Sequence, residues 1–233
     1  MKVFLSGRFG TAAGLLIALS VTGCNVLGPA GGVIGQAIPE HVAAEYAGLA
    51  HQRVAIMVWA EPGIHTDFPY LQMDLAAGLQ EKLKALQLDP KPKELEETQF
   101  PVRADTMALY QEDNPQLEAM PITDLAVKFN TDAKAQKVDR LVYVEISDFS
   151  TRSEASLELY KGNITGSLKV LELKDGKAKV VYSSQDDIKA TYPKDSPKEG
   201  MPEGSDAKIY QGTLDAFTTE LSHRLYTYEK EPE

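Results

Sequence analysis

The chain has a single cysteine, Cys24, among its 233 residues, and this limits how such a chain can be held together. One cysteine excludes an intramolecular disulfide, a cysteine-based zinc cluster and an iron–sulfur site. The length is sufficient for one domain with a proper buried core. Apolar residues make up 43% and charged residues 25%, which argues against general disorder and against a multi-span membrane protein. Stability must therefore come from an ordinary apolar core.

The first 23 residues are typical of a targeting segment. Lys2 and Arg8 give it a positive start, and residues 11–21 form an apolar run too short to span a bilayer. Together they predict a secretory signal peptide. The run ends in Val-Thr-Gly-Cys at residues 21–24, which resembles the lipobox of bacterial lipoproteins. An ordinary signal peptide with a chance cysteine is the alternative.

The lipobox resemblance implies that residues 1–23 are removed and that Cys24 carries a diacylglycerol and an N-acyl chain such as palmitate. More than one acyl chain gives stable membrane anchoring. Asn25 follows the cysteine, which in lipoproteins of enteric type favours the outer membrane over inner-membrane retention. Removal of Lys2 and Arg8 takes the formal net charge from −10 to −12, which disfavours nucleic acid and direct adhesion to anionic head groups. We therefore expect a lipid-anchored protein of the cell envelope that faces the periplasm.

Residues 24–39 are expected to form a flexible tether after the lipidated cysteine. Residues 26–39 hold four glycines and two prolines and carry no charge. Residues 40–233 are then expected to form a single globular domain.

Strand and helix patterns alternate in that domain. Residues 53–59 form a continuous apolar run, which suits a central strand buried on both faces. Leucines 71, 75, 79, 83 and 86 recur at helical spacing and predict an amphipathic helix capped by Thr66 or Asp67. The remaining patterns predict a solvated loop over 89–99, a weak strand at 100–103, helices over 105–112 and from 121, a strand at 141–146, a hairpin turning at 175–176, and a C-terminal helix from Ser205.

This order predicts an α/β or α+β fold, with a single mixed β-sheet, amphipathic helices packed on it and a β-hairpin in the C-terminal half. In topology it resembles the domain shared by peptidoglycan-synthase activator lipoproteins, curli-secretion lipoproteins and the N-terminal domain of TolB. The matching features are the strand at 53–58 leading into a helix, the junction at 135–144, and the hairpin over 168–182. Lys137 and Val138 stand where that group usually has a glycine.

Four segments resemble uncharacterised planctomycete-type envelope lipoproteins. They are residues 46–49, 54–59, 110–115 and 138–146. The resemblance implies a fold and a location, and it brings no known reaction.

Signatures of common enzymes are missing from the sequence. The four histidines never approach the spacing of a zincin, and no Gly-x-Ser-x-Gly motif occurs. The glycines of residues 28–35 lack both a preceding strand and the lysine of a phosphate-binding loop. The best remaining cluster is Glu61, His65 and Asp67, in the loop predicted after the first strand, where open sheets place ligands. We favour an exposed polar loop over a metal or proton-transfer site there.

We therefore expect a non-catalytic adaptor or assembly-accessory protein, without a cofactor, that binds an envelope protein partner. Two alternatives stay open: a small envelope hydrolase or metal- or ligand-binding enzyme using Glu61, His65 and Asp67, and an oligomeric secretion component.

Overall fold

The computed structural model describes residues 40–132, 136–194, 200–201 and 204–230. The predicted signal peptide (residues 1–23), Cys24 and the predicted tether (24–39) lie outside the described residues, so they stay predictions. The elements follow the order β1 (Glu40–Val42), β2 (Val54–Ala60), α1 (Pro62–Asp67), α2 (Leu71–Leu88), the short 3₁₀ helix η1 (Lys93–Leu95), α3 (Ala104–Asp113), the 3₁₀ helix η2 (Pro115–Ala119), α4 (Ile122–Asp132), β3 (Arg140–Ser153), β4 (Ser156–Lys174), β5 (Lys177–Ser183), β6 (Ile188–Tyr192), α5 (Asp206–His223) and β7 (Tyr228–Lys230).

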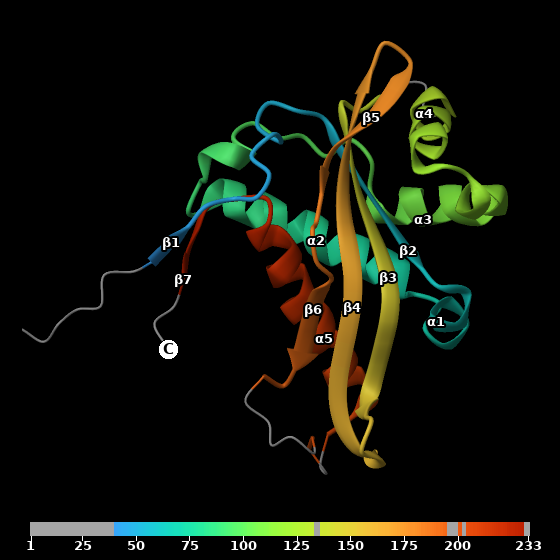
Figure 1. The fold of residues 1–233 in the computed structure, drawn as a ribbon, viewed down its shortest axis with the longest axis vertical. Coiled ribbons are helices and arrows are strands. Elements are labelled where there is room, and N and C mark those ends of the chain that lie inside the picture. The colour runs from blue at the N-terminus through green and yellow to red at the C-terminus, as the bar shows by residue number, and fades with distance from the viewer. Residues whose placement is uncertain (1–39, 133–135, 195–199, 202–203, 231–233) are drawn as a thin grey trace, which may run out of the picture. The chain divides into compact units, whose positions relative to one another are not determined.

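The main sheet is mixed, as predicted, and it has five strands. Its order is β2-β3-β4-β5, and β6 also pairs with β4. Strands β2 and β3 run parallel, whereas β3, β4, β5 and β6 pair antiparallel (Figure 1). The small strands β1 and β7 form a separate two-stranded sheet that the sequence pattern did not predict.

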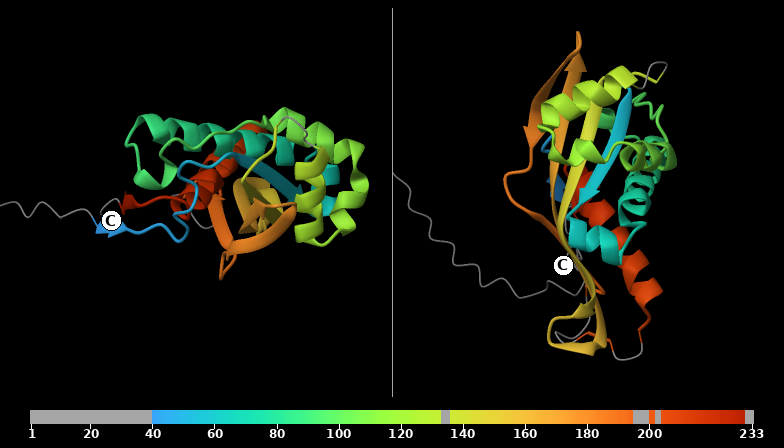
Figure 2. Two further views of the ribbon diagram at one scale, coloured as in Figure 1. Left: turned by 90° about the horizontal axis from the view of Figure 1, so that it is seen from above. Right: turned by 90° about the vertical axis from the view of Figure 1, so that its right-hand side faces the viewer.

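Helices cover both faces of the main sheet (Figure 2). Alternate residues of a strand point to opposite faces, so β2 supplies two separate apolar clusters. On one face, α2 and α5 bury Val54, Ile56 and Val58 together with Phe217. On the other face, α3 and α4 bury Ala55 and Met57. Two apolar layers, one on each side of the sheet, therefore form the core.

Strand β2 was predicted to be central, but it lies at an edge of the sheet. Every residue of β2 except Trp59 is buried, because helices cover both of its faces. An apolar run shows that both faces of a strand are buried, but it does not show whether both of its edges are paired. The prediction of a central position was therefore wrong. The bridge between Arg53 and Gln99 and the side chain of Gln111 cover parts of that edge.

The leucine stripe predicted for the next helix is confirmed. Leu71, Leu75, Leu79 and Leu83 of α2 are buried. The predicted cap is wrong, because residue 70 occupies the cap position without a side-chain hydrogen bond. Residues 62–67, predicted as a loop, instead form helix α1.

Helix α1 forms because its sequence favours a helical start. Pro62 occupies the first turn, where its missing N–H costs nothing. The Thr66 hydroxyl donates to the Pro62 carbonyl oxygen at 2.9 Å. The segment where a capping residue was expected is therefore already helical.

The strand predicted at 100–103 does not form. Only Gln99 makes a bridge to the edge of β2, and the chain turns away because α3 begins at Ala104. The Val102 carbonyl oxygen accepts a hydrogen bond from Gln80 Nε2 at 3.0 Å instead of from a strand. The loop over 89–99 is only partly solvated, since Leu95 is fully buried.

Two local predictions in the C-terminal half are confirmed. Asp175 and Gly176 have φ angles of 53° and 70°, as the tight turn between β4 and β5 requires. The Ser205 hydroxyl accepts a hydrogen bond from the Lys208 backbone N–H at 3.3 Å and so caps α5. None of the described helices is long and apolar enough to cross a membrane.

Candidate functional site

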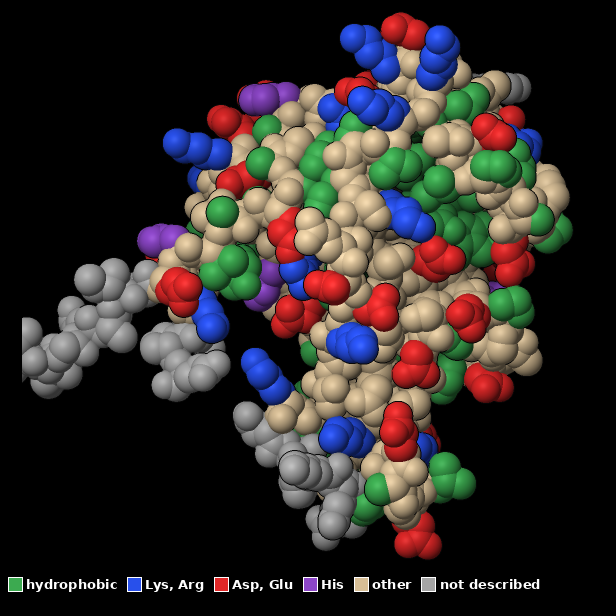
Figure 3. All heavy atoms as spheres, viewed as in Figure 1, with side chains coloured by type: hydrophobic (Ala, Val, Ile, Leu, Met, Phe, Trp, Pro, Cys, Tyr) green, Lys and Arg blue, Asp and Glu red, His purple; other side chains and the backbone are tan. Residues whose placement is uncertain are grey.

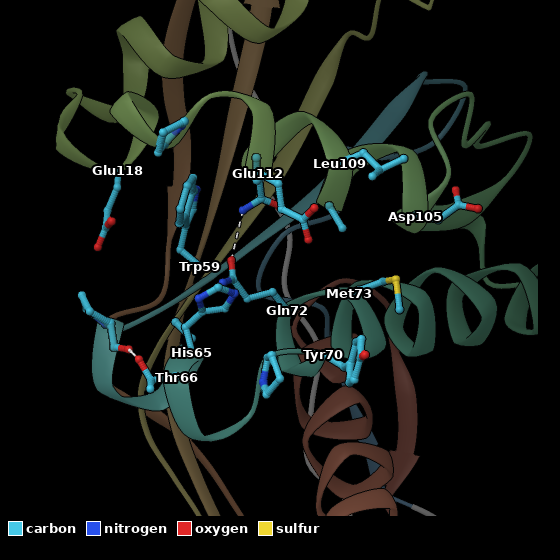
Figure 4. A pocket seen from close by; sticks show the side chains of 16 residues that line it. Trp59, His65, Thr66, Tyr70, Gln72, Met73, Asp105, Leu109, Glu112 and Glu118 are labelled. Carbon is cyan, nitrogen blue, oxygen red and sulfur yellow. Dashed lines mark hydrogen bonds between the residues drawn. The ribbon is translucent and has the colours of Figure 1, made fainter.

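A pocket with a volume of about 870 Å³ lies at the carboxyl end of β2. Its walls come from the end of β2, helix α1, the first turn of α2, helix α3 and the 3₁₀ helix η2 (Figure 4). In open α/β sheets, ligands bind beyond the carboxyl ends of the strands. The volume lies within the range of small-molecule sites. Position and size therefore make this pocket the candidate site.

Two glutamine side chains fix the pocket in place. Gln111 of α3 is buried, and its Nε2 donates to the Val58 carbonyl oxygen at 2.8 Å and to Gln72 Oε1 at 3.2 Å. A single amide thus joins α3 to the edge of β2 and to the start of α2 (Figure 4). A buried amide that loses its partners is costly, so this contact favours one spacing of the two helices.

Trp59 forms the apolar wall at the end of β2. It packs against the cluster beneath α3 and α4, and it is the only tryptophan in the chain. Its indole Nε1 is buried and has no hydrogen-bond partner among the described residues. A buried donor without a partner lowers stability by about 1–3 kcal/mol relative to a bonded one. The indole is therefore placed for its apolar surface, not for a hydrogen bond within the protein.

This arrangement predicts an unusually mild effect of Trp59→Phe. Phenylalanine keeps much of the apolar contact and removes the unpaired N–H, so we expect the free energy of unfolding to change by less than about 1 kcal/mol. Trp59→Ala should lower it by about 2–3 kcal/mol, since the ring contacts are lost. Urea unfolding followed by circular dichroism measures both. Equal losses in the two variants would show that the N–H is bonded after all.

The rim of the pocket combines exposed apolar groups with carboxylates. Tyr70 is 68% exposed and Leu109 is 60% exposed. Asp105, Glu112 and Glu118 also line the pocket. The Arg103 guanidinium donates to Asp105 at 2.9 Å, and this hydrogen bond is the main cause that lowers the pKa of that carboxyl. The rim is therefore acidic as well as apolar.

The predicted site residues lie on or beside α1, and the structure brings only one of them to the pocket. His65 lines the pocket, whereas Glu61 and Asp67 are exposed and are not among its lining residues. Glu61 precedes the helix, and its carbonyl oxygen accepts from the His65 backbone N–H at 3.0 Å. No group of three or more His, Cys, Asp or Glu residues in the described part of the chain could hold a metal ion.

The sequence interpretation missed most residues of the pocket. Trp59 was recognised only as part of a strand, and Gln72 was not singled out. Gln111 and Glu112 fall within residues 110–115, one of the segments that carry the lipoprotein resemblance, but no role followed from it. The signal that could have found Gln111 is its position four residues after Met107, on the buried face of α3.

Comparison with known proteins gives no sequence family. No family model and no curated protein matches the chain. Among solved structures, the chain is similar to a PelC dodecamer from Paraburkholderia phytofirmans, with a TM-score of 0.43 and 8% identity over 81% of this chain and 97% of that one. It is also similar to the lipoprotein GNA1162 from Neisseria meningitidis, with a TM-score of 0.41 and 10% identity over 73% and 97% of the two chains.

A third similar structure is the hypothetical protein CT253 from Chlamydia trachomatis. Its TM-score is 0.38, with 12% identity over 74% of this chain and 96% of that one. All three likenesses are weak. The function of the pocket is therefore argued from this chain's own residues.

Proposed function

We propose that the protein is a lipid-anchored lipoprotein of the bacterial cell envelope that binds another envelope component without catalysing a reaction. The pocket at the end of β2 is its binding site. The lipobox-like residues 21–24 support the anchor, and Asn25 favours the outer membrane, with the domain facing the periplasm.

The observation that carries the binding role is the composition of the pocket. Ligand sites are concave and mostly apolar, with a few polar groups at fixed positions. Here Trp59 gives an apolar wall, the Gln111 amide fixes the spacing, and Tyr70 and Leu109 leave large apolar surfaces exposed at the rim. Large exposed apolar side chains beside a hollow are surfaces that a ligand covers.

His65 favours a second candidate, a small envelope hydrolase. Imidazole side chains are common general acids and bases in enzymes, and His65 lines the pocket. The side chains that would assist it were predicted to be Glu61 and Asp67, and these stand outside the lining. This enzyme would have to use the rim carboxylates Asp105, Glu112 or Glu118 instead.

Photo-crosslinking in cells tests the binding role. A photoreactive amino acid at Leu109 of the full-length chain should give an adduct of one reproducible mass. Leu88 is the matched control, because it is 75% exposed at the opposite end of α2. Ala108→Trp fills the pocket from α3 and should abolish the adduct at Leu109. Equal adducts at Leu109 and Leu88, or an adduct that survives Ala108→Trp, would overturn the proposal.

A further inference from the structure

The pocket has a one-sided charge. Three carboxylates line it, from Asp105, Glu112 and Glu118, and none of its described lining residues is Lys or Arg. Arg103 pairs with Asp105, but neither Glu112 nor Glu118 forms an ion pair within the described residues. Two carboxylates at the rim therefore have no cationic partner among the described residues.

The aromatic wall lies next to these carboxylates. In Figure 4 the indole of Trp59 is drawn between the side chains of Glu118 and Glu112, and Tyr70 stands on the α2 side of the same pocket. The negative face of an aromatic ring attracts cations, and tryptophan does so best. A positive group in this pocket would meet a ring face and a carboxylate together.

The charge of Glu118 also acts on the sheet behind the pocket, where Glu145 is paired with Lys169 at 3.5 Å. Tyr143 of β3 is partly buried on the same side as Trp59. Burial raises the pKa of its hydroxyl, and the charges of Glu145 and Glu118 raise it further. Basic side chains gather elsewhere, at the β4–β5 turn flanked by Lys174 and Lys177, which lies at the opposite end of the sheet from α1 (Figures 1 and 3).

We propose that the pocket takes an organic cation, a guanidinium or ammonium group carried on an apolar stem. This inference rests on the proposed binding function and specifies its ligand class. The stem lies on Trp59 and Leu109, and the cation lies between Glu112 and Glu118. The occupant is a small molecule, because the volume of about 870 Å³ matches small-molecule sites.

Other ligand classes fit the rim less well. An anion would be repelled by two uncompensated carboxylates. A neutral apolar ligand would bury surface on Trp59 but would strip water from Glu112 and Glu118 without replacing its hydrogen bonds. A cation replaces that water with charge-assisted contacts.

The unique tryptophan makes the test direct, because its fluorescence reports on the pocket alone. The probe is n-octylguanidinium, and n-octylurea is its uncharged counterpart of nearly the same shape. The protein is the complete mature chain carrying Cys24→Ser, so that no detergent is needed. We expect a saturable change in Trp59 fluorescence, with octylguanidinium binding about tenfold more tightly than octylurea and losing that advantage as salt rises.

Variants that remove the charges of the two glutamates test whether these residues cause the preference for octylguanidinium. Glu112→Gln together with Glu118→Gln should reduce the affinity for octylguanidinium to that for octylurea, while the affinity for octylurea stays unchanged. Glu158→Gln, at an exposed carboxylate on β4, is the matched control and should change neither. Both pocket glutamates are exposed, so folding should survive, and circular dichroism checks this.

The outcomes separate this inference from the binding function. Three results would contradict a preference for cations and leave an apolar binding pocket. They are equal affinities for octylguanidinium and octylurea, tighter binding of octanoate than of octylguanidinium, and an unchanged preference for octylguanidinium in the double variant. If Trp59 fluorescence shows no saturable change, the proposal of a small-molecule cation is wrong. It is also wrong if an arginine-containing peptide binds and octylguanidinium does not. The binding function itself fails only through the crosslinking at Leu109.

Discussion

Replacing Cys24 by serine is expected to abolish the incorporation of labelled palmitate completely. The thiol is the group that forms the thioether to the lipid, and the chain has no second cysteine to take its place. Anchoring by two or more acyl chains is strong, since each buried methylene contributes about 0.8 kcal/mol. No other part of the mature chain is expected to replace that anchor, because the net charge of −12 that remains without Lys2 and Arg8 opposes adhesion to anionic lipid.

Fractionation then shows where the protein goes. In the test protein, a cleavable signal peptide replaces residues 1–23 and Cys24 is changed to serine. This protein should be found in the soluble periplasmic fraction instead of the membrane. The same signal peptide with the native lipobox residues 21–24 is the control and should keep it in the membrane. Asn25→Asp should shift the lipidated protein toward the inner membrane if the enteric sorting rule applies. Continued membrane fractionation of the serine variant would contradict the lipid anchor.

The parts of the fold that could be predicted are those with long, repeated patterns. The leucines of α2 repeat over about four turns, and the β4–β5 turn carries an Asp-Gly pair that only a few turn types accept. The parts that were missed are short. Helix α1 has six residues, and β1 and β7 have three each, too few to show a period. The edge position of β2 was hidden because its faces, which set the pattern, are both covered.

The site could be predicted in place but not in its residues. The pocket lies at the end of the first strand, which is the location that the topology of an open sheet favours for ligands. Glu61, His65 and Asp67 were singled out for their chemistry, and of these only His65 lines the pocket, whose walls also include Trp59 and Gln111. Those two residues reach the pocket through contacts between β2 and α3, which lie about fifty residues apart in sequence. Local spacing cannot reveal such contacts.

Replacing Gly166 by alanine is expected to lower the free energy of unfolding by about 3 kcal/mol, which corresponds to a fall in Tm of about 10 °C. Gly166 lies on β4 opposite Ile146 of β3. A Cβ atom there would stand 2.5 Å from the backbone oxygen of Glu145 and 3.2 Å from Cζ of Phe217. The side chain of Phe217 is fully buried on α5, so neither neighbour can withdraw without moving the sheet or the helix.

Two further variants identify which contact is responsible. Gly63→Ala on α1 is the matched control: a Cβ there meets nothing within 4 Å, so its effect should stay within about 1 kcal/mol. Phe217→Leu removes the ring that a Cβ on Gly166 would meet. It should not rescue Gly166→Ala, because the nearer obstacle is the backbone oxygen of Glu145, which no side-chain change removes. Thermal unfolding of the single and double variants measures the coupling. A full rescue would show that the strain lies in the packing of α5 on β4. The predicted lack of rescue would show that it lies in the β3–β4 ladder, next to the register shift that falls between Ile146 and Asp148 of β3.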